Sequence, residues 1–324
     1  MDVGIFVVDG VADFGLGALL GAFSTVNALR KELEHPPAAW NVRTVSLGES
    51  VRSASGNLVP TTPVHEITRP FDTLAVAAVD VLDPGPLVEL VSAPAHAEVL
   101  DTIRYARDQG VHLAAACTAT FFLAESGVLE GTPATTSWWL GASFRGRYPG
   151  VELDESRIVC HADGITTAGA SLSHMDMALS LVYRTSPVLA ERAMRYLTVA
   201  DRPSQAAYII PEVVARGNPL IVGYERWVRE HISDQFLITT AARELGVTER
   251  SLQRATRAAL GMSPKDFADD IRLDKATRLL RTTGLTVESV AREVGYVNAS
   301  ALRALARRRR GVSLAEIRAT RAPW

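Results

Sequence analysis

The chain has 324 residues, of which 47% are hydrophobic and 22% are charged, and its formal net charge is −2. This length allows two domains, and the hydrophobic content excludes a largely disordered protein. Two cysteines are too few for a disulfide framework and suit a reducing cytoplasm, where we expect the protein to be located. We expect no secretory signal because the N-terminus has no basic region before its apolar run, and no membrane span because no apolar stretch reaches about 18 residues.

The net charge is an average of two unlike parts. Residues 1–217 carry a net charge of −9, whereas residues 218–324 carry +7. A basic C-terminal third behind an acidic body is typical of a nucleic-acid module attached to a domain that does not touch nucleic acid.

Strands and helices are predicted to alternate over the first 200 residues. Apolar runs predict strands at 3–8, 42–47, 73–79 and 111–116, and a hairpin within 50–63. Helical periodicity predicts helices at 14–33, at 87–109 (broken near Pro94), and at 118–126, with a loop at 83–86. Two strands within residues 151–167, around residues 162–164, and helices at 171–183 and 187–199 follow. This order predicts an open, mostly parallel α/β sheet.

The second domain is predicted to be entirely helical. Residues 201–219 are rich in proline and glycine and have little periodicity, so we expect a linker between a domain at 1–200 and one at 220–324. In the second domain Ser263 is expected to cap a long connecting helix, with Asp266 at its third position, and Thr286 to cap the next.

One pattern occurs twice in this domain. The sequence ARELG at residues 242–246 is repeated as AREVG at residues 291–295. After these segments, Leu252 and Gly261 correspond to Leu302 and Gly311. A short helix, a glycine turn and a second helix, written twice, predict two helix-turn-helix motifs.

The outward face of each second helix is basic or small. Helical spacing places Arg250, Gln253, Arg254 and Arg257 on one side of the first. In the second it places Ser300, Arg303, Ala304 and Arg307 outward. Arginine and glutamine can form paired hydrogen bonds with base edges in the major groove. Two such helices on one rigid body are expected about one helical turn apart, roughly 34 Å.

Cys117 follows a predicted buried strand and precedes a helix, at the carboxyl edge of the sheet where ligands of open α/β folds bind. A helix N-terminus would lower the pKa of its thiol. Catalysis would need a proton acceptor beside the thiol, and Asp13, His161 and His174 are the candidates. No catalytic residue is predicted, and Cys117 and Asp13 stay candidates only. A small buried thiol in a tight turn is the structural alternative. No histidine or cysteine spacing indicates a metal site, and no cofactor is expected.

Two further segments are expected to shape a pocket beside Cys117. Residues 134–139 supply hydroxyls and two tryptophans, and residues 167–171 precede a helix and offer backbone N–H groups to an anionic ligand. The predicted pocket comprises Asp13, Cys117, Thr118, Ser137, Trp138, Gly169, Ala170 and His174.

The chain resembles two known families. Residues 246–254 (GVTERSLQR), 261–264 (GMSP) and 295–302 (GYVNASAL) are similar to the AraC/XylS family of transcription regulators. Residues 116–118 (ACT), 123–129 (LAESGVL), 131–136 (GTPATT) and 167–169 (TAG) resemble the PfpI/ThiJ, class I glutamine-amidotransferase-like (flavodoxin-like) fold. The combination is similar to GlxA-type regulators, in which an enzyme-like domain has become a sensor or dimerisation module.

The resemblance implies double-stranded promoter DNA as partner, a small-molecule effector and a homodimer formed through the N-terminal domain. It implies a DNA-binding surface made of Arg250, Ser251, Gln253, Arg254, Arg257, Ser300, Ala301, Arg303, Arg307 and Arg308.

Several residues depart from the family patterns. Thr256 stands where the family has an aromatic core residue, so we expect looser packing of the first motif. Ala304 stands where an arginine would read a base, so we expect the second motif to contact phosphates through residues 307–310 more than it reads bases. Ser137 replaces a histidine and Ala119 a glycine, which weakens the case for chemistry at Cys117. Two alternatives to a non-enzymatic regulator stay open: a hydratase, glyoxalase or amidase carrying a DNA-binding appendage, and a redox or electrophile sensor acting through Cys117.

Overall fold

The computed structural model describes residues 1–199, 204–211, 213, 218–235 and 237–319. The chain divides into two compact units. The first comprises residues 1–140 and 147–205, and the second comprises residues 141–146 and 206–324. Each unit has its own hydrophobic core.

A seven-stranded sheet forms the centre of the first unit, in the order β10-β11-β7-β6-β1-β2-β5. Its strands are β1 (Asp2–Phe6), β2 (Asn41–Ser46), β5 (Thr62–Pro63), β6 (Thr73–Val76), β7 (His112–Ala116), β10 (Val159–Ala162) and β11 (Ile165–Ala168). All neighbouring pairs are parallel except β10 and β11, which form an antiparallel hairpin. The predicted open, mostly parallel α/β sheet is confirmed.

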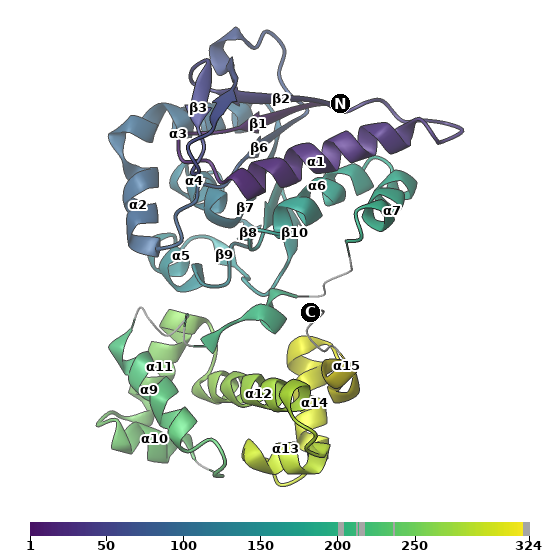
Figure 1. Cartoon of the computed structure of the whole chain (residues 1–324). Coiled ribbons are helices and arrows are strands. Elements are labelled where there is room, and N and C mark those ends of the chain that lie inside the picture. The colour runs from purple at the N-terminus through teal and green to yellow at the C-terminus, as the bar shows by residue number, and fades with distance from the viewer. Residues whose placement is uncertain (200–203, 212, 214–217, 236, 320–324) are drawn as a thin grey trace. The chain divides into compact units, whose positions relative to one another are not determined.

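Helices cover both faces of the sheet (Figure 1). On one face lie α1 (Asp13–Arg30), α6 (Ser173–Tyr183) and α7 (Pro187–Tyr196). Their buried side chains pack with alternate residues of β1, among them Val3 and Ile5. On the other face lie α2 (Pro84–Ser92), α3 (Ala97–Asp108) and α4 (Thr120–Glu125). In the described part of the chain, no helix combines the length and the apolar character that crossing a membrane requires.

Most predicted elements are found, with small differences. The break near Pro94 is a 3₁₀ turn, Pro94–His96, between α2 and α3, and the hairpin is β3 (Ser50–Arg52) with β4 (Leu58–Pro60). The predicted loop at 83–86 is wrong, because α2 begins at Pro84 and a proline is well accommodated in a first helical turn. Short elements without a periodic signal were not predicted: β5, β8 (Pro133–Ala134) and α5 (Gly141–Arg147). The short strand β9 (Glu152–Leu153) lies within the segment 151–167, where two strands were predicted.

The second unit is helical, as predicted. Its elements are α9 (Pro219–Glu230), α10 (Ile238–Glu244), α11 (Glu249–Leu260), α12 (Pro264–Thr282), α13 (Val287–Glu293), α14 (Ala299–Arg310) and α15 (Leu314–Ala319). Figure 1 shows α12 between the group α9–α11 and the group α13–α15. Phe267 and Ile271 of α12 belong to the first core, whereas Leu273 and Leu280 belong to the second. The long helix therefore joins two small cores.

Part of the predicted linker lies outside the described residues, namely 201–203, 212 and 214–217. Within the described part, Gln205–Tyr208 form a 3₁₀ turn, η4, and Gln205 is buried. This segment is therefore not purely a surface loop.

Candidate nucleic-acid interface and sheet-edge site

The first helix-turn-helix motif consists of α10 and α11. Gly246 makes the turn between them with φ of 70°, a left-handed conformation that glycine adopts without strain. Thr248 then caps α11, since its Oγ1 accepts a hydrogen bond from Ser251 N–H at 3.1 Å. Helix α11 ends at Gly261, which is left-handed with φ of 68°.

Helix α11 presents the predicted face to solvent. Arg250, Gln253, Arg254 and Arg257 are exposed, whereas Ser251 is half-buried, with its Oγ 2.8 Å from Thr248 Oγ1. The opposite face buries Leu252, Thr256 and Leu260. Thr256 is fully buried but satisfied, because its hydroxyl donates to the carbonyls of Leu252 and Gln253 at 3.0 and 3.1 Å.

The second motif repeats this geometry with α13 and α14. Gly295 has φ of 80°, Asn298 Oδ1 accepts from Ala301 N–H at 3.1 Å, and α14 ends at left-handed Gly311. Thr286 caps α13 as predicted, by accepting a hydrogen bond from Ser289 N–H.

Helix α14 also presents the predicted residues. Its exposed residues are Ser300, Ala301, Arg303, Ala304, Arg307 and Arg308. Its buried residues include Leu302, Leu305 and Ala306. Arg303 lies 3.3 Å from Glu288 of α13 in an exposed ion pair, which is weak and easily exchanged for another anion.

The arginine run at the end of α14 differs from the expectation of phosphate contacts. Arg309 is paired with Asp270 of α12, and Arg310 with Asp274 at 3.8 Å, and both guanidinium groups are mostly buried. Arg308 is largely exposed, yet it lies 3.4 Å from Asp269. Arg309 and Arg310 therefore join α14 to α12. Asp270 and Asp274, four residues apart, share a face of α12, but the sequence does not show which helix packs against that face, so these ion pairs were not predicted.

Cys117 occupies a sharp turn between β7 and a 3₁₀ turn (Cys117–Ala119) that leads into α4. Its φ is 60°, which is strained for a non-glycine residue. Ser137 Oγ donates to Cys117 Sγ at 3.0 Å, and Thr136 Oγ1 donates to the Cys117 carbonyl at 2.8 Å. Thr118 ties the turn to the neighbouring strand end by donating to the Val79 carbonyl at 2.7 Å.

The expected activation of Cys117 is contradicted. The side chain is 4% exposed, and burial raises the pKa of its thiol, an effect that outweighs the hydrogen bonds from Ser137 and its other neighbours. Within the described residues, neither a histidine nor a carboxylate forms a hydrogen bond with Sγ. The arrangement therefore holds a protonated thiol.

The three candidate bases are engaged elsewhere. Asp13 accepts hydrogen bonds from Ser53 Oγ at 2.7 Å, Asn57 Nδ2 and Ser55 N–H, and these bonds, led by that of Ser53, hold the pKa of Asp13 well below its usual range. His161 Nδ1 lies 2.8 Å from Thr166 Oγ1.

His174 is buried in α6. Its Nδ1 lies 2.7 Å from the Ser171 carbonyl, so Nδ1 carries the proton. Burial lowers the pKa of His174 to about 4. Among the described residues Nε2 has no hydrogen-bond partner, and a Cβ at Gly15 of α1 would lie 2.8 Å from it. His174 thus fills the contact between α1 and α6.

Most of the predicted pocket residues are buried. Thr118, Ser137 and Gly169 are buried, whereas Trp138 and Ala170 are half-buried. The expected anion site is wrong in one respect: the Ala170 N–H is not free, because it donates to Gln205 Oε1 at 2.8 Å. Gln205 was not identified from the sequence, since it lies within the predicted linker.

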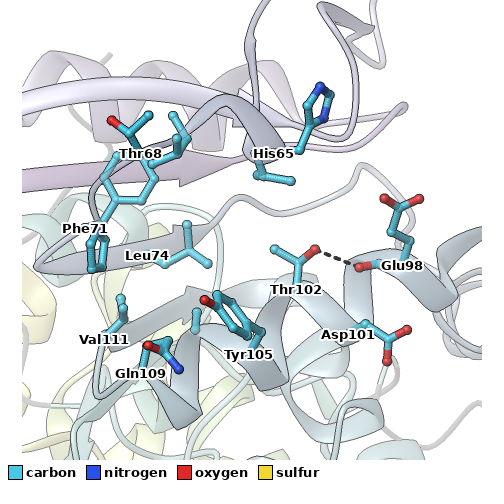
Figure 2. Close-up of a pocket in the computed structure, with 14 residues that line it drawn as sticks. His65, Thr68, Phe71, Leu74, Glu98, Asp101, Thr102, Tyr105, Gln109 and Val111 are labelled. Atoms are coloured by element: carbon cyan, nitrogen blue, oxygen red, sulfur yellow. Dashed lines mark hydrogen bonds between the residues drawn. The ribbon is translucent and has the colours of Figure 1, made fainter.

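A separate cavity of about 520 Å³ lies between α3 and the segment before β6. Figure 2 shows that Phe71, Leu74, Tyr105, Glu98 and Asp101 are among the residues that line it. No motif in the sequence predicted this cavity. No cluster of three or more potential metal ligands occurs among the described residues.

Comparison with known proteins places both parts of the chain. Residues 1–184 match the model of the DJ-1/PfpI family, and residues 241–320 match that of a helix-turn-helix domain. The HTH-type transcriptional regulator CdhR of Pseudomonas aeruginosa is 28% identical over 232 residues, which is 69% of this chain and 69% of that protein. The regulator GlxA of Rhizobium meliloti is 24% identical over 258 residues, covering 74% of this chain and 78% of GlxA.

Other relatives match over shorter stretches. GbdR of Pseudomonas aeruginosa is 23% identical over 195 residues, 59% of this chain but only 53% of GbdR, so the match spans about half of that protein.

Two solved structures share the fold. An AraC family transcriptional regulator from Pseudomonas putida has a TM-score of 0.50 at 20% identity, and a regulator described as putative from Vibrio parahaemolyticus has 0.51 at 17%. They cover 60% and 61% of this chain, and 98% of each of those chains. Because the family match spans more than half of the sequence, the protein belongs to the DJ-1/PfpI family, and it carries a C-terminal helix-turn-helix domain of the AraC type.

Proposed function

We propose that the chain is a sequence-specific DNA-binding transcription regulator. Residues 220–324 read promoter DNA, residues 1–200 form a sensing or dimerisation domain, and residues 201–219 connect them. The observation that carries this proposal is the pair of exposed faces on α11 and α14, each presented by a helix-turn-helix motif and both joined to α12.

The cations of α11 are available for DNA. Arg250, Arg254 and Arg257 are exposed, and no ion pair is formed by them within the described residues. By contrast, Arg309 and Arg310 are engaged with carboxylates of α12. Arg254 and Gln253 on α11 are therefore placed to read bases, with Ser300, Ala301 and Arg303 on α14, whereas Arg307 and Arg308 contact phosphates.

The N-terminal domain acts by binding rather than by catalysis in this proposal. The buried, protonated thiol of Cys117 and the engaged side chains of Asp13 and His174 argue against the enzyme alternative and against the thiol-sensor alternative. The names of CdhR and GlxA as transcriptional regulators support the same role here. A cytoplasmic homodimer that responds to a small-molecule effector completes the proposal.

The test compares alanine substitutions of three arginines, one on α11, one on α14 and one in the first unit. A binding site is first selected from random duplexes with the full-length protein, and affinities for that site and for a scrambled duplex are then measured. Arg254→Ala should weaken binding to the selected site by about 1–3 kcal/mol and relax the preference at one base pair. Arg308→Ala should weaken binding to both duplexes alike and reduce the dependence on salt.

Arg192→Ala is the matched control, because Arg192 is paired with Glu32 in the first unit. It should leave both affinities unchanged. If Arg254→Ala weakened binding to the selected and the scrambled duplex equally, as is expected of Arg308→Ala, the assignment of α11 as a base-reading helix would be wrong.

A further inference from the structure

Gln205 is a buried polar residue beyond the last helix of the α/β fold. It is the final residue of the first compact unit, yet its side chain is only 2% exposed. Its backbone N–H donates to the Ser156 carbonyl at 2.7 Å, and Ser204 Oγ donates to the same oxygen at 2.7 Å. The start of the connection to the second unit is therefore fixed to the loop before β10.

The amide group of Gln205 is surrounded by backbone groups. Oε1 accepts from Ala170 N–H at 2.8 Å. Nε2 lies 2.8, 2.9 and 3.1 Å from the carbonyl oxygens of Arg157, Thr136 and Glu155. We call these four groups the amide cradle: the N–H of Ala170 and the carbonyls of Thr136, Glu155 and Arg157.

The cradle selects one chemical group. It offers one donor on one side and three acceptors on the other, which matches a primary carboxamide. A carboxylate would direct an oxygen at three carbonyl oxygens, and an ammonium would leave the Ala170 N–H without an acceptor. Either mismatch leaves buried polar groups unsatisfied, which is costly.

The amide group of Gln205 fits against Gly169 because glycine has no side chain. A Cβ at this position would lie 2.1 Å from Gln205 Cδ, so any larger residue would exclude the amide. Gly169 N–H donates instead to the Ile158 carbonyl at 2.9 Å, away from the cradle. The cradle also borders the Cys117 turn, because Thr136 donates from its hydroxyl to the Cys117 carbonyl.

We propose that the amide cradle is a binding site for primary carboxamides, that Gln205 occupies it as an intramolecular ligand, and that a small carboxamide effector displaces Gln205 and frees the segment that leads to the DNA-binding domain. The proposal that the cradle binds a carboxamide rests on the hydrogen bonds of Gln205 described above. Only its consequence for DNA binding rests on the proposed function.

Hydrogen exchange at Ala170 reports occupancy directly, because this N–H is bonded to Gln205 Oε1. In the full-length protein Gln205→Ala should accelerate exchange at Ala170 by roughly tenfold or more, since its partly buried hydrogen bond is lost. Exchange at neighbouring Gly169 should not change, which shows that the domain is still folded. Gln205→Glu, which keeps the shape but replaces the amide donor, should accelerate exchange like the alanine variant.

Chemical rescue tests the specificity. Propionamide added to the Gln205→Ala protein should slow exchange at Ala170 again, whereas propionate and propylamine should not. In the wild-type protein more propionamide should be needed, because the tethered amide competes at high effective concentration. Unchanged exchange at Ala170 in the Gln205→Ala protein would overturn the whole proposal, and rescue by all three compounds or by none would overturn the carboxamide site.

These measurements contain no DNA. A failure of the rescue would leave the DNA-binding proposal intact, and a failure of Arg254→Ala to alter specificity would leave the amide cradle intact. The effect on DNA is measured separately: Gln205→Ala should change the affinity for the selected duplex at least threefold, and an unchanged affinity would refute the coupling between the cradle and DNA binding.

Discussion

The hydroxyl of Tyr296 donates to Asp269 Oδ1 at 2.7 Å and ties the second helix-turn-helix motif to α12. Asp269 is 3% exposed, and its other oxygen is approached by Lys265 Nζ at 2.9 Å and Arg308 Nη2 at 3.4 Å. A buried carboxylate needs all of these partners, so the contact fixes the turn of the second motif relative to the connecting helix.

Tyr296→Phe should therefore destabilise the C-terminal domain. Removing the hydroxyl leaves Asp269 Oδ1 short of a donor, at a cost of about 1–3 kcal/mol in the free energy of unfolding. Urea denaturation followed by circular dichroism measures this change. Val297→Ala is the control, because Val297 is 73% exposed next to Tyr296 and should have little effect. Equal stabilities of the Tyr296→Phe and Val297→Ala proteins would show that the hydrogen bond contributes nothing.

The pair of Arg309 and Asp270 gives a second prediction. Arg309→Met leaves the mostly buried carboxylate of Asp270 without its partner and should cost about 3–5 kcal/mol. Adding Asp270→Leu to Arg309→Met should recover much of this loss, because an apolar pair carries no desolvation cost. Thermal unfolding of the single and double variants measures the difference, and a double variant less stable than the single one would contradict the structural role assigned to this pair.

Cys117 should react slowly in the folded protein. Its pKa is raised by burial, so the thiol is protonated at neutral pH. In a Cys160→Ser background, alkylation by iodoacetamide at pH 7.5 should be at least about 100-fold slower in the native protein than in urea. Alkylation at a comparable rate in both states would instead favour a reactive thiol and revive the enzyme and thiol-sensor alternatives.

His174 predicts an acid-sensitive N-terminal domain. Its pKa is about 4 in the folded protein, against 6.5 for an ordinary histidine. Between these values the unfolded chain binds a proton that the folded chain does not, so stability falls by about 1.4 kcal/mol per pH unit as the pH is lowered. This contribution is fully present above pH 6.5, and the loss ends near pH 4.

His174→Asn should flatten that dependence by about one proton, because the asparagine amide can still donate to the Ser171 carbonyl but does not titrate. His112, whose pKa is also lowered to about 4, keeps its own contribution in both proteins. Denaturant titrations at pH 7, 6 and 5 provide the slopes. Identical slopes in the wild-type and His174→Asn proteins would exclude the assignment.

Local patterns allowed much of the fold and of the DNA-binding face to be predicted. The 3.6-residue period separates Arg254 from Leu252, and Thr248 and Gly261 mark the ends of α11. Contacts between distant segments were beyond such patterns. The partner of Arg309 lies 39 residues away, and Gln205 meets Ala170 across 35 residues. The raised pKa of Cys117 likewise depends on tertiary burial, which its position before a helix does not reveal.

In the proposed complex, α11 and α14 bind one duplex through adjacent major-groove segments. Methylation protection at guanine N7, which lies in the major groove, tests it most directly on the selected site. For each bound protomer we predict two protected segments about 10 base pairs apart, of which Arg254→Ala removes one and Arg303→Ala the other. Protection of a single segment, or loss of the same segment in both variants, would contradict the claim.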